Sequence, residues 1–99
     1  MAYKIILEDR AIEEIDDVFN WYENQKIGLG TDFMVEVYDY LDLISQSPKL
    51  FPIDFKQYRR AVLKRFSKYV LIYSIEEQEI FVLSVFNTLQ NPDKKYDDF

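Results

Sequence analysis

Residues 68–87 read KYVLIYSIEEQEIFVLSVFN, and this stretch decides the fold more than any other part of the chain. It contains two apolar runs, rich in β-branched and aromatic residues, that are separated by the short polar segment EEQE. Such runs are typical of strands, and a tight polar turn between them favours an antiparallel hairpin. The stretch therefore predicts two paired strands in the C-terminal half of the chain.

The segments before this hairpin predict a third strand and a loop. Residues 57–66, QYRRAVLKRF, alternate between two sets of side chains, which is typical of a strand. Residues 47–55, SPKLFPIDF, contain two prolines and predict a loop.

Two amphipathic helices and a short strand are predicted further upstream. The first helix begins at the N-cap Asp9 and stops near Gly28, with apolar residues at i, i+3 and i+4 spacing. The second begins near residues 30–31 and ends before Pro48, because proline disfavours helix in the residue before it. Residues 3–8, YKIILE, predict the strand that precedes both helices.

The predicted order of elements is therefore β-α-α-β-β-β. Two helices followed by a meander indicate an α+β fold, in which a helical hairpin packs on one face of an antiparallel sheet. The chain has 99 residues, of which 48% are hydrophobic, and we expect a single domain over residues 1–99.

The composition excludes several classes of protein. The chain has no cysteine, so neither a disulfide framework nor a thiolate metal site can form, and a reducing cytoplasm is the expected setting. It has no histidine, which excludes a histidine-pair nuclease and a Ser-His-Asp hydrolase. We expect no metal and no cofactor. The N-terminus does not resemble a signal peptide, and the apolar runs are too short to span a membrane.

The charge is distributed unevenly along the chain. The formal net charge is −6, yet six of the twelve basic residues fall between Lys56 and Lys68. No acidic residue interrupts the stretch from Lys56 to Ile75. Most of the surface would therefore repel nucleic acid, whereas this one basic segment could bind phosphate.

The basic residues are functional candidates because of where a strand would place them. Arg59 and Arg65 would share one face of the sheet, and Arg60 and Lys64 would share the other. Arginine forms bidentate contacts with phosphate, and lysine supplies a point charge or a base. The alternatives are an edge strand protected against aggregation by its charge, or cations that pair with the acidic helices. Periodicity alone leaves these alternatives open.

Aromatic and acidic residues elsewhere also have structural alternatives. Trp21 lies off the apolar stripe of its helix and either packs on a loop or contacts a partner. Tyr69 and Tyr73 share a strand face, where core packing is more common than stacking on bases. The acidic run EEIDD (13–17) is interpreted as a solvated face rather than a metal site. Tyr96, beside two lysines in the tail, is either a proton donor or part of a frayed terminus.

Five short motifs occur together along the chain. They are G-L-G before a Phe, a P-x-x-x-P pair, an Arg pair, a Y-x-x-x-Y strand and a V-F-x-T-x-x-x-P ending. In this order they resemble the toxins of RelE/ParE-type bacterial toxin–antitoxin systems, and the resemblance covers most of the chain. It implies a compact α/β toxin that is neutralised by a cognate antitoxin in a toxin–antitoxin hetero-oligomer.

The resemblance also implies one of two activities. RelE-like members cut mRNA within the ribosome, and ParE-like members inhibit DNA gyrase. Cleavage by the neighbouring 2′-OH needs a base, cations for the charged phosphorane and a donor for the leaving oxygen. The resemblance assigns this chemistry to Arg59, Arg60, Lys64, Arg65, Gln90 and Tyr96. It assigns antitoxin binding to Trp21, Arg60 and Lys64.

The end of the last strand departs from the pattern of the family. Members often have His-Thr-x-Arg-Asp-Pro there, and this chain has NTLQNP, so Asn87 takes the His position and Gln90 the Arg position. Gln90 can donate a hydrogen bond but cannot neutralise a phosphate. The basic segment favours ribosome-dependent mRNA cleavage, which we therefore expect. Gln90 and the overall acidity favour the alternatives, a gyrase inhibitor or a weakened toxin that retains only antitoxin binding.

Overall fold

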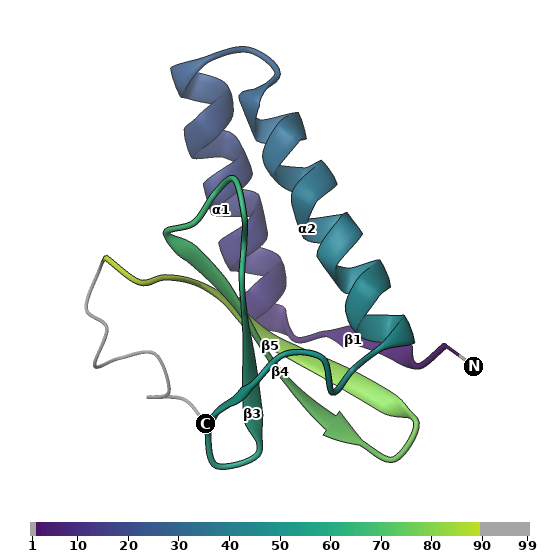
Figure 1. The fold of residues 1–99 in the computed structure, drawn as a ribbon. Coiled ribbons are helices and arrows are strands. Elements are labelled where there is room, and N and C mark those ends of the chain that lie inside the picture. Colours follow the sequence, from purple (N-terminus) through teal and green to yellow (C-terminus); the bar gives the residue numbers. More distant parts are fainter. Residues whose placement is uncertain (1, 90–99) are drawn as a thin grey trace.

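The helices and strands follow the predicted order in the computed structural model, which describes residues 2–89 (Figure 1). Their bounds are β1 Lys4–Leu7, α1 Asp9–Gln25, α2 Leu29–Gln46, β2 Ile53–Phe55, β3 Tyr58–Val62, β4 Tyr69–Glu76 and β5 Glu79–Asn87. The α+β class and the β-α-α-β-β-β order are confirmed. The short strand β2 is an addition, since it forms within the segment that the two prolines assigned to a loop.

All five strands form one sheet in the order β1-β5-β4-β3-β2. The predicted hairpin lies at its centre, where β4 and β5 pair antiparallel from Tyr69 opposite Asn87 to Glu76 opposite Glu79. β3 and β2 continue the antiparallel pattern, whereas β1 pairs with β5 in parallel. The sheet is thus mixed, with one parallel pair at the β1 edge.

The two helices form a hairpin that covers one face of the sheet (Figure 1). Their inward side chains are buried, as the helical spacing predicts: Ala11, Ile15, Val18, Tyr22, Phe33, Val37, Leu41 and Ile44. They pack against the alternate residues of β4 and β5 that face them: Tyr69, Leu71, Tyr73, Ile80, Val82 and Val85. Burial of this apolar surface is the main force that holds the helical hairpin on the sheet.

The turn between the helices depends on one carboxylate and two glycines. Glu23 Oε1 accepts the main-chain N–H groups of Gly28 at 3.0 Å, Gly30 at 2.9 Å and Thr31 at 3.3 Å. Gly28 has a φ of 90°, which favours glycine. A Cβ on Gly30 would lie 2.5 Å from the main-chain oxygen of Phe19. The two helices can therefore approach closely at this end.

The opposite face of the sheet carries a smaller apolar cluster. Val70, Ile72 and Phe86 are buried there and pack with Tyr58 and Leu83. Tyr58, Val70 and Ile72 alternate along β3 and β4 with residues that face the helices, as expected for strands. Leu83 and Phe86 lie on β5, next to the helix-facing Val82 and Val85. None of the helices within residues 2–89 is long and apolar enough to cross a membrane.

Candidate functional site

The basic segment does not form one continuous strand. β3 ends at Val62, and residues 63–68 form a turn that leads into β4. The expectation of a strand over 57–66 is therefore wrong beyond residue 62. The chain leaves the strand because the ring of Phe66 turns into the core, where its centroid lies 4.9 Å from that of Tyr22 and 5.4 Å from that of Phe33.

Arg59 is part of the internal structure of the protein. It lies on the helix-facing side of β3, and its Nη1 donates to the main-chain oxygen of Phe51 at 2.7 Å and of Lys49 at 3.5 Å. Tyr73, its cross-strand neighbour, donates its hydroxyl to the main-chain oxygen of Pro48 at 2.7 Å. The two side chains together hold the 48–51 loop against the sheet.

The tyrosines of β4 also belong to the core. Tyr69 and Tyr73 are both buried, so the core-packing alternative is confirmed over stacking on bases. Burial raises the pKa of Tyr73 to about 12, although the nearby charge of Arg59 acts in the opposite direction. Its hydroxyl therefore remains protonated at physiological pH and serves as a hydrogen-bond donor.

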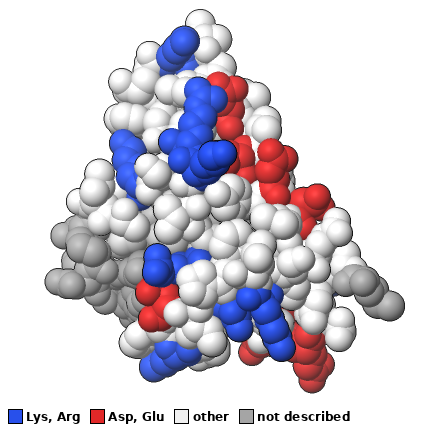
Figure 2. Space-filling view, viewed as in Figure 1, with Lys and Arg blue, Asp and Glu red and all other residues white. Residues whose placement is uncertain are grey.

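Arg60 lies on the other face of the sheet from Arg59. Its Nε lies 3.3 Å from Asp54 Oδ1, across the β2–β3 pair. Both side chains remain partly exposed, so this ion pair is screened by solvent and contributes little to stability. In Figure 2, basic groups form one set over this lower part of the molecule and a second set beside the helices. The two sets are not continuous on the face that is shown.

Lys64 and Arg65 both lie in the 63–68 turn. The N–H of Arg65 donates to Glu36 Oε2 at 2.9 Å, and the N–H of Phe66 donates to Glu36 Oε1 at 3.1 Å. The guanidinium of Arg65 lies 3.0 Å from Asp32 Oδ2. Lys64 is exposed, and its ammonium has no ion-pair partner among residues 2–89. Glu36 and Asp32 thus hold the turn against α2. Among residues 2–89, Lys64 is the one candidate cation of the four whose side chain has neither an ion pair nor a hydrogen bond.

The structure thus places the candidate cations at three separate positions. Arg59 faces the helices, Arg60 faces the opposite side of the sheet, and Lys64 and Arg65 lie in the turn. The alternative of cations that pair with the acidic helices holds for Arg65, whose partner Asp32 lies in α2, whereas Arg60 pairs with Asp54 of β2. Gln90 and Tyr96 lie outside the described residues.

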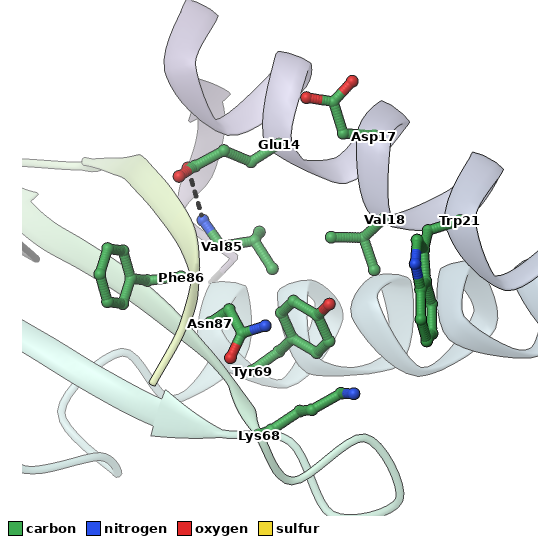
Figure 3. Close-up of a pocket in the computed structure, with 9 residues that line it drawn as sticks. All are labelled: Glu14, Asp17, Val18, Trp21, Lys68, Tyr69, Val85, Phe86 and Asn87. Atoms are coloured by element: carbon green, nitrogen blue, oxygen red, sulfur yellow. Dashed lines mark hydrogen bonds between the residues drawn. The ribbon is translucent and has the colours of Figure 1, made fainter. Parts of the chain in front are cut away.

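A separate pocket of about 370 Å³ lies between α1 and the ends of β4 and β5 (Figure 3). We call it the Trp21 pocket; it is lined by Glu14, Asp17, Val18, Trp21, Lys68, Tyr69, Val85, Phe86 and Asn87. Trp21 remains 50% exposed at this pocket. The Lys68 ammonium lies 5.1 Å from the centre of the Trp21 ring, which is the range of a cation–π contact.

The chemistry of the Trp21 pocket suits binding better than proton transfer. Glu14 Oε1 is already occupied, because it accepts the Ser84 hydroxyl at 2.6 Å and the Val85 N–H at 3.1 Å. Burial raises the pKa of Tyr69, against hydrogen bonds from Asn87 and Tyr22 that lower it, so its hydroxyl stays protonated. What remains is an aromatic face with one cation, Lys68, and one carboxylate, Asp17. Within the described part of the chain, no group of histidine, cysteine or acidic residues could hold a metal ion.

The sequence pointed to part of this pocket. Trp21 was identified because it lies off the apolar stripe, and it is half exposed as that position suggests. Lys68 and Asp17 were not selected as site residues. The only signal for Asp17 was its position one helical turn before Trp21, and nothing local connects either residue with Lys68.

Comparisons with known proteins place the chain in a family. Residues 5–92 match the family model described as the ParE toxin of the type II toxin–antitoxin system, parDE. The chain belongs to this ParE toxin family. The match begins within β1 and continues to the end of β5, so it includes the basic segment and the Trp21 pocket.

The fold of this ParE-family toxin is also found among solved structures. A chain of the chromosomal ParDE system from P. aeruginosa is similar, with a TM-score of 0.76 and 12% sequence identity. The similarity covers 87% of this chain and 96% of that chain. At this identity the likeness shows the fold alone. No curated protein sequence matches the chain.

Proposed function

We propose that this ParE-family toxin inhibits DNA gyrase by binding to it in the cytoplasm, and that a cognate antitoxin neutralises it. The observation that carries this proposal is the separation of the four candidate cations. mRNA cleavage requires several charged groups around a single phosphorus atom. A toxin that inhibits by binding has no such requirement.

The engagement of the cations supports the same conclusion. Arg59 donates to main-chain carbonyls, and Arg65 is paired with Asp32 at 3.0 Å. Each would have to break these contacts before it could stabilise a phosphorane. Since loss of one preorganised donor costs on the order of 10²–10³ in rate, this arrangement is a poor starting point for phosphoryl transfer. The match to the ParE toxin family model supports the same proposal.

Two assays with the purified protein test the proposal. In the first, increasing amounts are added to DNA gyrase with relaxed plasmid, and negative supercoiling is followed by gel electrophoresis. In the second, the protein is added to a cell-free bacterial translation reaction, and mRNA 5′ ends are mapped by primer extension. We expect supercoiling to be inhibited and mRNA to stay intact, and addition of the antitoxin encoded by the neighbouring gene to restore supercoiling.

The variant Arg60→Ala, Lys64→Ala separates this proposal from the mRNA-cleavage alternative. New 5′ ends that require ribosomes and disappear in this variant, together with normal supercoiling, would overturn the proposal. Normal supercoiling and intact mRNA would instead identify a weakened toxin that retains only antitoxin binding.

A further inference from the structure

We propose that the Trp21 pocket binds an unpaired guanine base, with the ring stacked on Trp21 and its O6 and N7 facing donors at the ends of β4 and β5. The pocket has a volume of about 370 Å³. Pockets of roughly 300–1,000 Å³ are typical of small-molecule sites. The inference goes beyond the proposed function, because the ligand binds to the toxin itself and requires neither gyrase nor the antitoxin.

The stacking surface is the indole of Trp21. This large apolar side chain is 50% exposed. Its edge-on contact with Tyr22, at 5.1 Å between ring centroids and 80° between the ring planes, sets the orientation of the indole. Val18, one helical turn earlier in α1, lines the pocket beside it (Figure 3). Half-exposed aromatic surfaces of this kind are where unpaired bases stack on proteins.

Two donors lie on the sheet side of the pocket. Tyr69 pairs with Asn87 across β4 and β5, and the main-chain oxygen of Lys68 accepts the N–H of Thr88 at 2.8 Å. This register brings the side chains of Lys68 and Asn87 to the same side of the pocket (Figure 3). The Lys68 ammonium lies 5.1 Å from the centre of the indole and has neither an ion pair nor a hydrogen bond among residues 2–89. It can therefore turn toward an acceptor on a ligand without breaking an ion pair.

The amide of Asn87 decides which base fits. Its Oδ1 already accepts the N–H of Leu89 at 2.9 Å, and its nitrogen points toward Tyr69 and the pocket (Figure 3). Asparagine binds adenine with Oδ1 on N6 and Nδ2 on N7, and here that pairing would compete with Leu89. Lys68 and Asn87 thus present donors. Guanine has two acceptors, O6 and N7, on the matching edge, whereas adenine has the N6 donor beside N7.

The acidic residues of the pocket favour a neutral ligand. Glu14 is occupied by Ser84 and Val85, whereas Asp17 is exposed and has neither a hydrogen bond nor an ion pair within the described part of the chain. The N1–H and N2–H₂ donors of guanine lie away from N7 and suit the α1 side, to which Asp17 belongs. The same carboxylate repels phosphate. We therefore expect the ligand to be guanosine rather than a nucleotide or a strand.

The fluorescence of Trp21 reports directly on stacking, because it is the one tryptophan of the chain. Guanosine is titrated into the purified toxin, and the affinity is measured independently by titration calorimetry. We expect saturable quenching, with a Kd for adenosine at least about tenfold higher than for guanosine. Inosine keeps O6 and N7 and should bind more tightly than adenosine. 5′-GMP should bind more weakly than guanosine, most clearly at low ionic strength.

Variants identify the groups that recognise the base. Lys68→Met removes the ammonium and keeps an unbranched side chain; it should raise the Kd for guanosine at least about tenfold and reduce the preference over adenosine. Lys64→Met is the matched control, since this exposed lysine of the same turn does not line the pocket, and should alter the Kd by less than about twofold. Trp21→Ala, followed by calorimetry, should raise the Kd at least about tenfold. Thermal unfolding confirms that each variant is folded.

Two single-stranded oligonucleotides of equal length, one of dG and one of dA, distinguish the source of the base. If the dG strand binds more tightly than guanosine and than the dA strand, and Lys68→Met weakens it, guanine recognition stands and its source is a nucleic acid strand. If both strands bind equally, or guanosine and adenosine bind equally, the inference is wrong. The absence of saturable binding by every nucleoside and strand would also overturn it. Gyrase inhibition is measured separately, so each of these failures leaves the proposed function intact.

Discussion

Two irregular segments of this toxin are held by opposite chemistry. The 48–51 loop is held by donors from the sheet, since Tyr73 and Arg59 donate to its main-chain carbonyls. The 63–68 turn is held by an acceptor from the helices, since Glu36 receives two of its N–H groups. The first set of contacts is at the buried side of β3 and β4. The second lies at the surface.

This difference shows that a charged side chain in a small domain can have a structural role rather than a functional one. The sequence suggested a functional role for Arg59 and none for Glu36. In the structure both side chains form hydrogen bonds with main-chain groups that would otherwise lack partners. Many polar side chains near a protein core have this role. Because contacts at the surface are screened by salt, the 63–68 turn should also be the more easily opened of the two.

The largest expected effect is a loss of stability at alkaline pH, caused by the buried Tyr73 that holds the 48–51 loop. Burial raises the pKa of Tyr73 from 10.0 to about 12, so its contribution to stability is complete below pH 10. Between pH 10 and 12 the unfolded chain loses this proton while the folded protein retains it. We expect the free energy of unfolding to fall by about 2–3 kcal/mol over this range. Urea unfolding at a series of pH values measures the loss.

The variant Tyr73→Phe isolates this contribution from other groups that titrate in the same range. It should cost about 1 kcal/mol at pH 7, because the carbonyl of Pro48 loses its donor. Its stability should then decline less steeply above pH 10 than that of the unchanged protein. An equally steep decline in both proteins would show that Tyr73 is not the group responsible.

A smaller loss of stability is expected when the 63–68 turn at the surface loses its acceptor. Glu36→Ala leaves the N–H groups of Arg65 and Phe66 without their acceptor, and we expect a loss of about 1–2 kcal/mol. Amide hydrogen exchange at these two residues should become faster. Glu13→Ala is the matched control, since Glu13 has no such contact within the described residues, and should change stability by less than about 0.5 kcal/mol. Unchanged exchange in Glu36→Ala would mean that the turn does not depend on this carboxylate.

Most of the fold could be predicted because its strongest signals are local. The apolar spacing of the two helices and the two runs of the β4–β5 hairpin each extend over enough residues to show a clear period. β2 has only three residues and follows a proline, so it had no such signal. The end of β3 was missed for a different reason. The alternating pattern of side chains continues in the sequence to Phe66. The carboxylate that binds the main chain of the turn belongs to Glu36, about thirty residues earlier in the chain.

The candidate site was harder to predict for the same physical reason. The partner of Arg65 is Asp32, and the acceptors of Arg59 are carbonyls in a loop, and neither relation leaves a pattern in the sequence. Trp21 was found because its helical position is itself a local property. The exposure of Ile12 was not predicted, because periodicity shows which face of a helix is apolar but not whether a neighbouring helix covers it.

The smallest expected effect compares two adjacent arginines on opposite faces of β3. Arg59→Ala removes a donor at 2.7 Å from the carbonyl of Phe51 and should cost about 1 kcal/mol. Arg60→Ala breaks a partly exposed ion pair with Asp54 and should cost less than about 0.5 kcal/mol. Urea unfolding at pH 7 and moderate ionic strength resolves the two values. If Arg60→Ala is as destabilising as Arg59→Ala, the contribution of these arginines to stability does not depend on which face of the sheet they lie on. If Arg59→Ala abolishes gyrase inhibition while stability is unchanged, Arg59 belongs to a functional surface rather than to the hold on the 48–51 loop.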